Sequence, residues 1–496
     1  MLMERYLLGI DIGTTGTKTL LFSENGRFLG RAYRGYETYT PQVGYAEQDP
    51  EDWWRAVTET VRELCHTPEI AENVAAISLS LQGGTMVPVD AEGQPLRRAF
   101  VWSDQRCVLE REEFLREASS AEDMYQLTGW KLGNGLPALA IRWMRNHEPE
   151  LFSRTAMFMT VPDYISRRMT GIAAVDPSDF GINQLGDIRR GRYDETLLRF
   201  AGITEAQLPP IVPTGAAIGP LTPQAAEELG LTTRTILAAG AHDQYAVTTG
   251  AGMTSPGDIL IGSGTSWVVT ALSDRPAFDK GLSQSISGIP GVWGSLLSLS
   301  SGGVYLEWLR RSISTGADDM SYEQINREAA RRKAAEDSLF FYPSAGFSVP
   351  GAPFPKGTFI GLDLSHDRYH MARAIMEGVA FQITWMMESF PTQPTKNGIK
   401  LAGGAARSPL WCQLLADISG YPIRIPEVAD LACVGAAIQA GIGCGIYTDA
   451  EDGYRHMAVQ EQILYPQTAA AARYTLLKGE YRRCAALLGN VYGLMP

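Results

Sequence analysis

The stretch from Tyr6 to Phe22 reads YLLGIDIGTTGTKTLLF. An apolar strand, a Gly/Thr turn and an alternating strand that returns predict a β-hairpin. Asp11 stands near the end of the first strand, and the turn behind it contains Gly13, Thr14, Thr15 and Gly16. Glycine permits close backbone approach, so N–H groups and threonine hydroxyls can converge on an anion. A carboxylate beside such a turn indicates a metal–phosphate site, and a plain structural hairpin is the alternative for these residues alone.

A second stretch, Asp258 to Thr270, reads DILIGSGTSWVVT and forms a weak internal repeat of the first. Superposing the two turns places Gly264-Thr265-Ser266 on Gly13-Thr14-Thr15, and Gly262 then takes the place of Asp11. Two similar turns, only one with a carboxylate, predict two domains that hold one nucleotide from opposite sides. Chance similarity of two Gly/Thr turns is the alternative.

Composition narrows the class of protein. The chain has 496 residues, 45% of them hydrophobic, which predicts a globular protein of two to four domains. A net charge of -12 argues against binding to nucleic acid or an anionic membrane. The six cysteines show no CxxC spacing, so we expect no structural zinc and a reducing, cytoplasmic location. No signal peptide is expected, and the apolar tract 431–447, with Gln439 and several glycines, is a poor membrane span.

Strands alternate with helices along the chain, which predicts an α/β layered fold. Asp49 is a candidate N-cap with Pro50 at the first helical position. Strand 399–402 runs into Gly403-Gly404-Ala405, with Ser408 as N-cap of a helix ending at Gly420, a turn suited to a nucleotide. Other helices are expected at 109–119, 136–146, 162–169, 303–312, 322–335, 370–390 and 469–488, and loops at 171–223 and 340–361.

These motifs together resemble the FGGY family of carbohydrate kinases, over essentially the whole chain and in the right order. Motifs typical of the family are GYAEQDPEDWW (Gly44 to Trp54), FVWSDQR (Phe100 to Arg106), Gly240-Ala241-His242-Asp243-Gln244 and GTFIGLDLSHDRYHMARAIME (Gly357 to Glu377). The N-terminal signature region, Leu136 to His147, fits with one departure, Ala140 in place of the usual Lys.

The resemblance implies an actin/hexokinase-like (ribonuclease H-like) duplicated α/β ATPase fold, with two domains around a central cleft. Residues 1–246 would bind the sugar and carry the catalytic aspartate, and residues 247–496 would bind the nucleotide. The last helix is a candidate to pack back on the first domain.

The resemblance also implies roles for single residues. Asp243 falls on the catalytic base and is a second candidate metal ligand, and Asp11 falls on the residue that organises Mg²⁺ through water. His242 is a rival base, because its ordinary pKa suits proton transfer. The positions that would bind ATP are Thr14, Thr15, Lys18, Gly264, Thr265, Gly303, Gly403, Gly404 and Ser408. A purely structural role is the alternative for Thr265, Gly303, Gly404 and Ser408.

The acceptor side departs from well-known members of the family. Candidate substrate-binding residues are Gln82, Gly83, Trp102, Asp104, Asp243 and Gln244, with a place in the core as the alternative for Trp102. Xylulose kinases tend to carry Gln-Met-His-Gly and glycerol kinases Gln-Arg-Glu-Thr where this chain has Gln82-Gly83-Gly84-Thr85. The loop Ala345 to Pro350 also differs from the Gly-Glu-Arg-x-Pro of pentulose kinases.

The resemblance therefore predicts an ATP- and Mg²⁺-dependent kinase for a small-molecule sugar, with a ketose such as xylulose or a related pentulose as the best acceptor. A kinase for another polyol or sugar acid (glycerol, erythritol or gluconate type) and a non-catalytic sugar or nucleotide sensor are the alternatives. Assembly as a homodimer is left open.

Overall fold

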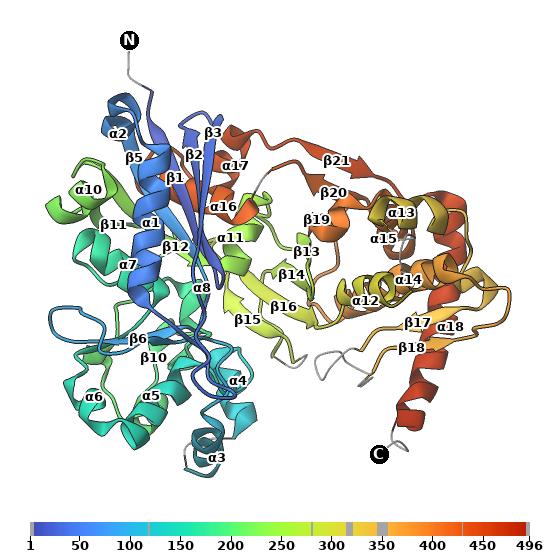
Figure 1. Ribbon diagram of the computed structural model, residues 1–496, viewed down its shortest axis with the longest axis horizontal. Coiled ribbons are helices and arrows are strands. Elements are labelled where there is room, and N and C mark those ends of the chain that lie inside the picture. Colours follow the sequence, from blue (N-terminus) through green and yellow to red (C-terminus); the bar gives the residue numbers. More distant parts are fainter. Residues whose placement is uncertain are drawn as a thin grey trace. The chain divides into compact units, whose positions relative to one another are not determined.

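The computed structural model describes residues 4–117, 120–278, 281–313, 321–344, 356–428 and 430–492. Its contacts divide the chain into two compact units (Figure 1). The first unit comprises Met1–Thr254, Ser283–Gly294 and Val428–Val459, and the second comprises Ser255–Leu282, Ser295–Glu427 and Gln460–Pro496. The loop from Ala345 to Pro350, singled out in the sequence, lies outside the described residues.

The first unit is built on a six-stranded sheet with the order β11-β12-β5-β1-β2-β3. Strand β1 (Tyr6–Ile12) pairs antiparallel with β2 (Gly16–Ser23) and parallel with β5 (Val74–Leu81), so the predicted hairpin is confirmed. The other strands of this sheet are β3 (Phe28–Gly35), β11 (Ala217–Pro220) and β12 (Ile236–His242).

The two faces of this sheet follow from the alternation of side chains along β1. Leu8, Ile10 and Ile12 belong to one core with helix α1 (Pro50–Leu64), whereas Leu7 belongs to another core with helix α16 (Leu431–Gly443). Gly9 lies on the α16 face, where a β-carbon would come within 1.9 Å of the carbonyl oxygen of Cys433. Glycine is required there because the helix backbone lies against the strand, and Asp11, two residues further on, takes the same face.

Asp49 caps α1, as expected: its side chain accepts the N–H of Glu51, and Pro50 opens the helix. The other helices of the unit are α2 (Pro68–Asn73), α3 (Val108–Glu117), α4 (Ala121–Thr128), α5 (Pro137–His147), α6 (Pro149–Arg154), α7 (Val161–Thr170), α8 (Pro177–Phe180), α9 (Glu195–Ala201), α10 (Pro223–Leu229), α11 (Asp243–Gly250) and α17 (Ala450–Met457). The smaller strands are β4 (Glu47–Gln48), β6 (Met86–Val89), β7 (Ala99–Phe100), β8 (Met157–Thr160), β9 (Gly186–Asp187), β10 (Arg192–Tyr193) and β15 (Ser283–Ile286).

Helix α16 packs on the sheet and on α11, which begins at Asp243. The two helices meet at glycines: a β-carbon on Gly250 would lie 1.9 Å from the oxygen of Leu431, and one on Gly435 would lie 1.9 Å from the oxygen of Ala246. Most of the apolar tract 431–447 therefore forms a buried core helix, which ends at Gly443. In the described part of the chain, no helix has the length and apolar character needed to span a membrane.

The second unit contains the strand order β16-β14-β13-β19-β20-β21. Strand β13 (Ile259–Ser263) pairs antiparallel with β14 (Trp267–Ser273) and parallel with β19 (Ile399–Gly403), which repeats the pairing of β1 with β2 and β5. Its other elements are β16 (Trp293–Leu299), β17 (Phe340–Tyr342), β18 (Thr358–Ile360), β20 (Ile423–Pro426), β21 (Glu461–Leu464), α12 (Val304–Ile313), α13 (Tyr322–Ala329), α14 (Arg368–Met387), α15 (Pro409–Ser419) and α18 (Thr468–Tyr492).

The repeat seen in the sequence is thus a repeat of hairpins, with one difference. Four residues separate the paired Ile12 and Thr17, whereas three separate the paired Ser263 and Trp267. The second turn is one residue shorter, and its Gly264 N–H donates to the oxygen of Ser266 at 3.1 Å.

Several expectations need correction. The region 340–361 is not all loop, because β17 and β18 pair antiparallel, and the loop-rich region 171–223 contains α8, α9, β9, β10 and β11. The helix expected over 322–335 ends at Ala329.

The division into units also differs from a single boundary after residue 246. Residues Val428–Val459 return to the first unit, since α16 covers its sheet. Tyr474, Tyr481 and Leu488 of the last helix, α18, lie in the core of the second unit.

Candidate active site

Asp11 lies at the centre of a small charged cluster in the first unit. Its Oδ1 accepts a hydrogen bond from Ser80 Oγ at 2.8 Å, and its Oδ2 lies 3.5 Å from Lys18 Nζ. Lys18 Nζ also lies 2.9 Å from Oδ2 of Asp430, the N-cap of α16. Burial, together with the charge of Asp430, raises the pKa of Asp11 to about 6, against the opposing charge of Lys18.

This cluster fits a hydrated divalent cation better than a protein-enclosed one. One lysine faces two carboxylates, so a further positive charge would be stabilised there. No group of three or more His, Cys, Asp or Glu residues gathers into a metal cage among the residues described. Mg²⁺ bound to nucleotides commonly uses one or two carboxylates and keeps several waters, and Asp11 can serve such an ion.

In the turn after Asp11, Thr15 is exposed to solvent and Thr14 is half-buried. The N–H of Gly13 donates to the oxygen of Gly16 at 3.1 Å, which closes the turn. The indole Nε1 of Trp102 donates to Thr14 Oγ1 at 3.2 Å, and this tryptophan is 48% exposed. Trp102 is therefore not a core residue, and it lies beside the phosphate-type turn.

Gln48 connects this turn to the end of β5. Its amide donates to the oxygen of Thr14 at 2.7 Å, and its Oε1 accepts from the amide of Gln82 at 2.8 Å and from Trp53 Nε1 at 3.0 Å. Gln48 is fully buried. The position of Gln82, a predicted acceptor-binding residue, is thus tied to the phosphate-type turn by two hydrogen bonds.

Asp243 opens helix α11, directly after β12. Its side chain is 38% exposed, and its Oδ1 lies 3.4 Å from Nδ1 of the buried His242. The backbone N–H of His242 donates to Ser178 Oγ at 2.9 Å, which fixes the end of β12. Gln244, the next residue of the helix, is half-buried. Asp243 is the more accessible of the two candidate bases.

Gly83, His242 and Asp179 come together at the carboxyl ends of β5 and β12. A β-carbon on Gly83 would lie 2.3 Å from His242 Cδ2 and 2.8 Å from Asp179 Oδ1. The ring of Trp130 packs edge-on against His242 with centroids 5.9 Å apart. Glycine at position 83 is what allows these groups to approach.

Buried acids surround this point. Burial raises the pKa of Asp179 well above its usual range, and the charges of Asp176 and Asp163 raise it further. Burial also raises the pKa of Asp163 to about 8, although the N–H and hydroxyl of Thr160 stabilise its ionised form. Asp243 is one of the groups that raise the pKa of Asp179 and also that of Asp11. Asp243 therefore lies within electrostatic reach of both clusters.

Asp104 occupies a different environment from the one expected of a ligand. It is 1% exposed, pairs with Arg106 at 2.7 Å and accepts the N–H of Ala46 at 2.7 Å. Arg106 also pairs with Glu47 at 2.8 Å. These contacts favour a role for Asp104 in holding the loop that carries Trp102.

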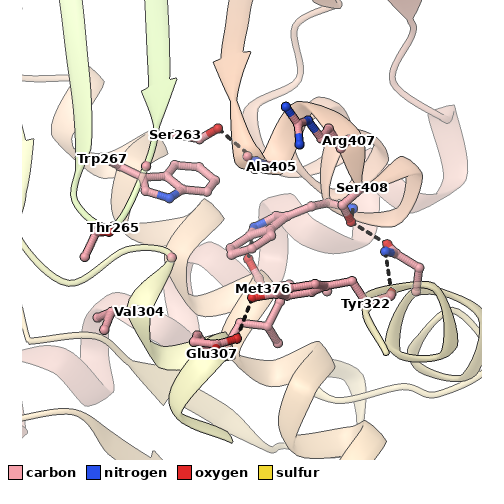
Figure 2. Close-up of a pocket in the computed structure, with 16 residues that line it drawn as sticks. Ser263, Thr265, Trp267, Val304, Glu307, Tyr322, Met376, Ala405, Arg407 and Ser408 are labelled. Atoms are coloured by element: carbon pink, nitrogen blue, oxygen red, sulfur yellow. Dashed lines mark hydrogen bonds between the residues drawn. The ribbon is translucent and has the colours of Figure 1, made fainter. Parts of the chain in front are cut away.

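The second unit contains a pocket of about 490 Å³ at the shorter turn (Figure 2). Five of the expected nucleotide-binding residues line it, namely Gly264, Thr265, Gly303, Gly404 and Ser408. Gly403, another of the expected residues, has φ +93° and stands beside the pocket, where a β-carbon would lie 2.3 Å from the oxygen of Ser263.

Aromatic side chains give this pocket an apolar wall. Trp267 and Trp411 line it with ring centroids 5.0 Å apart, and Met376 lies among them. Ser408 caps α15 as expected, and its hydroxyl bonds Asn326 of α13. A large apolar pocket with a few polar groups at its edge suits a nucleoside base.

Sequence reasoning missed several residues of these sites. Asp430 was missed although its Asp-Leu-Ala-Cys context is an N-cap signal before an apolar helix. Gln48 lies inside the motif Gly44 to Trp54, but nothing in the sequence indicates which residues it bonds. Asp163, Asp176 and Asp179 gave no signal, because their convergence depends on segments far apart in the chain. Trp267, Trp411 and Asn326 of the nucleotide-type pocket were missed for the same reason.

These features together define a phosphotransferase. They are a carboxylate at a helix start, a carboxylate–lysine cluster at a Gly/Thr turn and a separate pocket of a size that suits a nucleotide. Models of the FGGY family of carbohydrate kinases match the chain over residues 6–250 (N-terminal domain) and 259–444 (C-terminal domain). The chain belongs to this family and is a carbohydrate kinase. ATP is the phosphoryl donor typical of such kinases.

Individual relatives cover the full length. The chain is 30% identical to the L-xylulose/3-keto-L-gulonate kinase of Escherichia coli (strain K12), over 99% of this chain and 98% of the relative. It is 29% identical to a gluconokinase of Bacillus subtilis (strain 168), over 99% and 97%. The crystal structure of xylulose kinase from Rhodospirillum rubrum matches with a TM-score of 0.90 at 28% identity, over 99% of this chain and 100% of that one. The duplicated two-domain α/β fold of the family is thereby confirmed.

Proposed function

We propose that the chain transfers the γ-phosphoryl group of ATP to a hydroxyl of a ketose, with xylulose or a related pentulose as the best candidate. The observation that carries the proposal is Asp243 at the start of α11, partly exposed and within electrostatic reach of both the Asp11 cluster and Asp179. A carboxylate in this position can contact the hydroxyl of an acceptor bound near Asp179 and also lie close to phosphates bound near Asp11.

In the proposed reaction, Asp243 takes the proton of the acceptor hydroxyl. The acceptor oxygen then bonds to the γ-phosphorus, while the bond from that phosphorus to the β–γ bridging oxygen breaks and ADP leaves. Lys18 and the backbone and hydroxyl groups of Thr14 and Thr15 would bind the phosphates, and the pocket around Trp267 would bind the base.

Mg²⁺ belongs to this proposal, with Asp11 as its principal ligand through water and Asp243 as a second. Held there, Mg²⁺ would offset the negative charge of the phosphates. The lysine shared by two carboxylates, Asp11 and Asp430, supports this assignment because the cluster has excess negative charge.

We further infer a cytoplasmic location, because all six cysteines are free. The separation of sugar binding in the first domain from base binding in the second, and a homodimeric assembly, also remain proposals.

The test is a screen for acceptor-dependent ADP release over ketoses, polyols and sugar acids. We expect the highest kcat/KM with a ketopentose. ADP release only with another polyol or with a sugar acid would show that this compound, and not a ketose, is the acceptor. A protein that binds ATP but releases no ADP with any compound of the panel would favour a non-catalytic sensor.

A further inference from the structure

The pocket of the second unit is walled by flat and apolar side chains. Trp267 and Trp411 line it with ring centroids 5.0 Å apart, and Figure 2 shows Trp267, Met376 and Tyr322 around the same cavity. Aromatic side chains stack on a nucleobase through its π-face, which every base has. Stacking therefore binds a base without reading the groups on its edge.

Asn326 of α13 brings an amide to the lining, and both ends of this amide are engaged within the protein. Its nitrogen donates to the oxygen of Tyr322 at 2.8 Å, and its Oδ1 accepts a hydrogen bond from Ser408 Oγ. Ser408 Oγ also accepts the N–H of Trp411 at 3.1 Å. The acceptor atoms of Asn326 and Ser408 are therefore bonded to protein groups rather than directed at a ligand.

Two more polar side chains of the lining are engaged in the same way. Ser263 Oγ accepts the N–H of Ala405 at 3.0 Å and donates to a backbone oxygen of β19 at 2.6 Å. Glu307 accepts the hydroxyl of Tyr322 at 2.7 Å and pairs with Arg310 at 2.8 Å. These oxygens belong to the hydrogen-bond network of the protein itself.

The indole nitrogens of the two tryptophans are also turned toward the protein. Trp411 Nε1 donates to the oxygen of Met376 at 3.2 Å. A β-carbon on Gly302 would lie 2.8 Å from Nε1 of Trp267, and Trp267 is 1% exposed. The tryptophans therefore offer ring faces to a ligand rather than hydrogen-bond donors.

Two exposed side chains of the lining, Thr265 and Arg407, have no hydrogen-bond partner in the described structure. Thr265 lies in the turn that repeats the phosphate-type turn at Thr14. Arg407 can only donate, so it cannot accept the amino group of adenine, whereas O6 and N7 of guanine can accept from it. The unpartnered side chains therefore give adenine no advantage over guanine.

We propose that the donor site binds purine nucleoside triphosphates without selecting adenine, so that GTP replaces ATP with a kcat/KM within about tenfold. An apolar pocket discriminates weakly between ligands of similar shape, whereas a site that hydrogen-bonds a group strongly rejects ligands that lack it. This inference rests on the proposed kinase function and extends the donor from ATP to the purine class.

The first experiment measures base selectivity by binding to the full-length protein without an acceptor. Its probes are ADP, GDP and the 5′-diphosphate of purine riboside, which share ribose and phosphates but differ at C6 of the base. Dissociation constants are obtained from ligand-induced thermal stabilisation at one fixed Mg²⁺ concentration. We expect the three constants to agree within about tenfold.

A preference for ADP over GDP or over the purine riboside diphosphate that exceeds about tenfold would overturn the proposal. Binding of none of the three would overturn it as well. Turnover is then compared between ATP and GTP. Failure of the kinase function is distinguishable, because neither nucleotide would then be turned over while the binding constants remain measurable.

The second experiment creates the missing base contact. Ser408→Ala removes the donor to Asn326 Oδ1, and this oxygen can then accept the 6-amino group of adenine but not O6 of guanine. We expect the preference for ADP over GDP to rise by about three- to tenfold, the contribution of one hydrogen bond.

Ser321→Ala is the matched control. It removes the serine N-cap of α13, as Ser408→Ala removes that of α15, but keeps the hydrogen bond between Ser408 and Asn326. We expect its preference between ADP and GDP to equal that of the wild type. An unchanged preference in Ser408→Ala would contradict the structural basis of the proposal.

Discussion

Gly83 faces the imidazole of His242 so closely that a β-carbon on residue 83 would lie 2.3 Å from Cδ2. A real Cβ cannot approach a ring carbon to that distance, so Gly83→Ala must displace His242 or the end of β5. We expect the acceptor KM to rise by at least about tenfold, because the displaced groups belong to the proposed acceptor site.

ATP binding to Gly83→Ala should stay normal, since the nucleotide-type pocket is built from other segments. Gly219→Ala is the matched control, because its β-carbon would make an ordinary contact of 3.5 Å with Ile172. If Gly83→Ala left the acceptor KM unchanged, the groups around residue 83 would not bind the acceptor.

Asp243→Asn removes the proposed base while keeping the size of the side chain. Turnover should fall by roughly 10²- to 10⁴-fold, the usual contribution of general base catalysis. Steady-state ADP release gives the loss, and nucleotide-induced thermal stabilisation checks that ATP still binds.

The companion variant His242→Gln tests the rival base. If His242 accepted the proton, its replacement would cost as much turnover as that of Asp243. We expect instead a smaller loss in kcat and a larger change in acceptor KM, since His242 is buried against Gly83.

Asp11→Asn should weaken activation by Mg²⁺. The charge lost is the one that would orient the hydrated ion, so the Mg²⁺ concentration for half-maximal rate should rise by roughly 10- to 100-fold. A titration of rate against free Mg²⁺ at fixed ATP measures the change. Glu112→Gln, an exposed charge change on α3, should leave the titration as in the wild type.

We expect the stability of the folded protein to depend on pH through Asp163. Burial raises its pKa in the folded chain to about 8 from an ordinary value of 3.8. The folded state therefore binds the proton of Asp163 more tightly than the unfolded state does. The stabilisation of the folded state by this proton is complete below the pKa of Asp163 in the unfolded chain. It is lost as the pH rises through the pKa of Asp163 in the folded chain.

Asp163→Asn resembles the protonated acid and can still accept the N–H of Thr160, which the native side chain accepts at 2.7 Å. Relative to the wild type, its unfolding midpoint in urea should rise steadily between about pH 5 and 8. Tryptophan fluorescence can follow the transition. A difference between the two proteins that does not vary with pH would show that Asp163 keeps an ordinary pKa.

Val304→Trp should obstruct the pocket of the second unit. Val304 lines this pocket and is 39% exposed, so a larger side chain can be accommodated without disturbing the core. We expect the KM for ATP to rise by about tenfold or more, with acceptor binding unchanged.

Trp308→Ala on the same helix is the control, because Trp308 is half-exposed and lies outside the lining of that pocket. A normal ATP KM in Val304→Trp would show that the base binds elsewhere.

The sequence by itself determined the features that depend on neighbouring residues. The hairpin at Tyr6–Phe22, its echo at Gly264, the caps at Asp49 and Ser408 and the strand–helix alternation all follow from local rules of propensity and capping. Order and spacing of such local motifs were enough to identify the family.

Only the tertiary structure decided which distant groups meet. Lys18 pairs with Asp430, Gln48 links Thr14 to Gln82, and Asp179 reaches Gly83. It also placed the buried Asp104 against the backbone N–H of Ala46 and assigned α16 to the first unit. Such contacts join segments tens to hundreds of residues apart, and their formation depends on packing that no local pattern encodes. The turn at Asp11 could therefore be predicted from the sequence, whereas the charged residues that surround it could not.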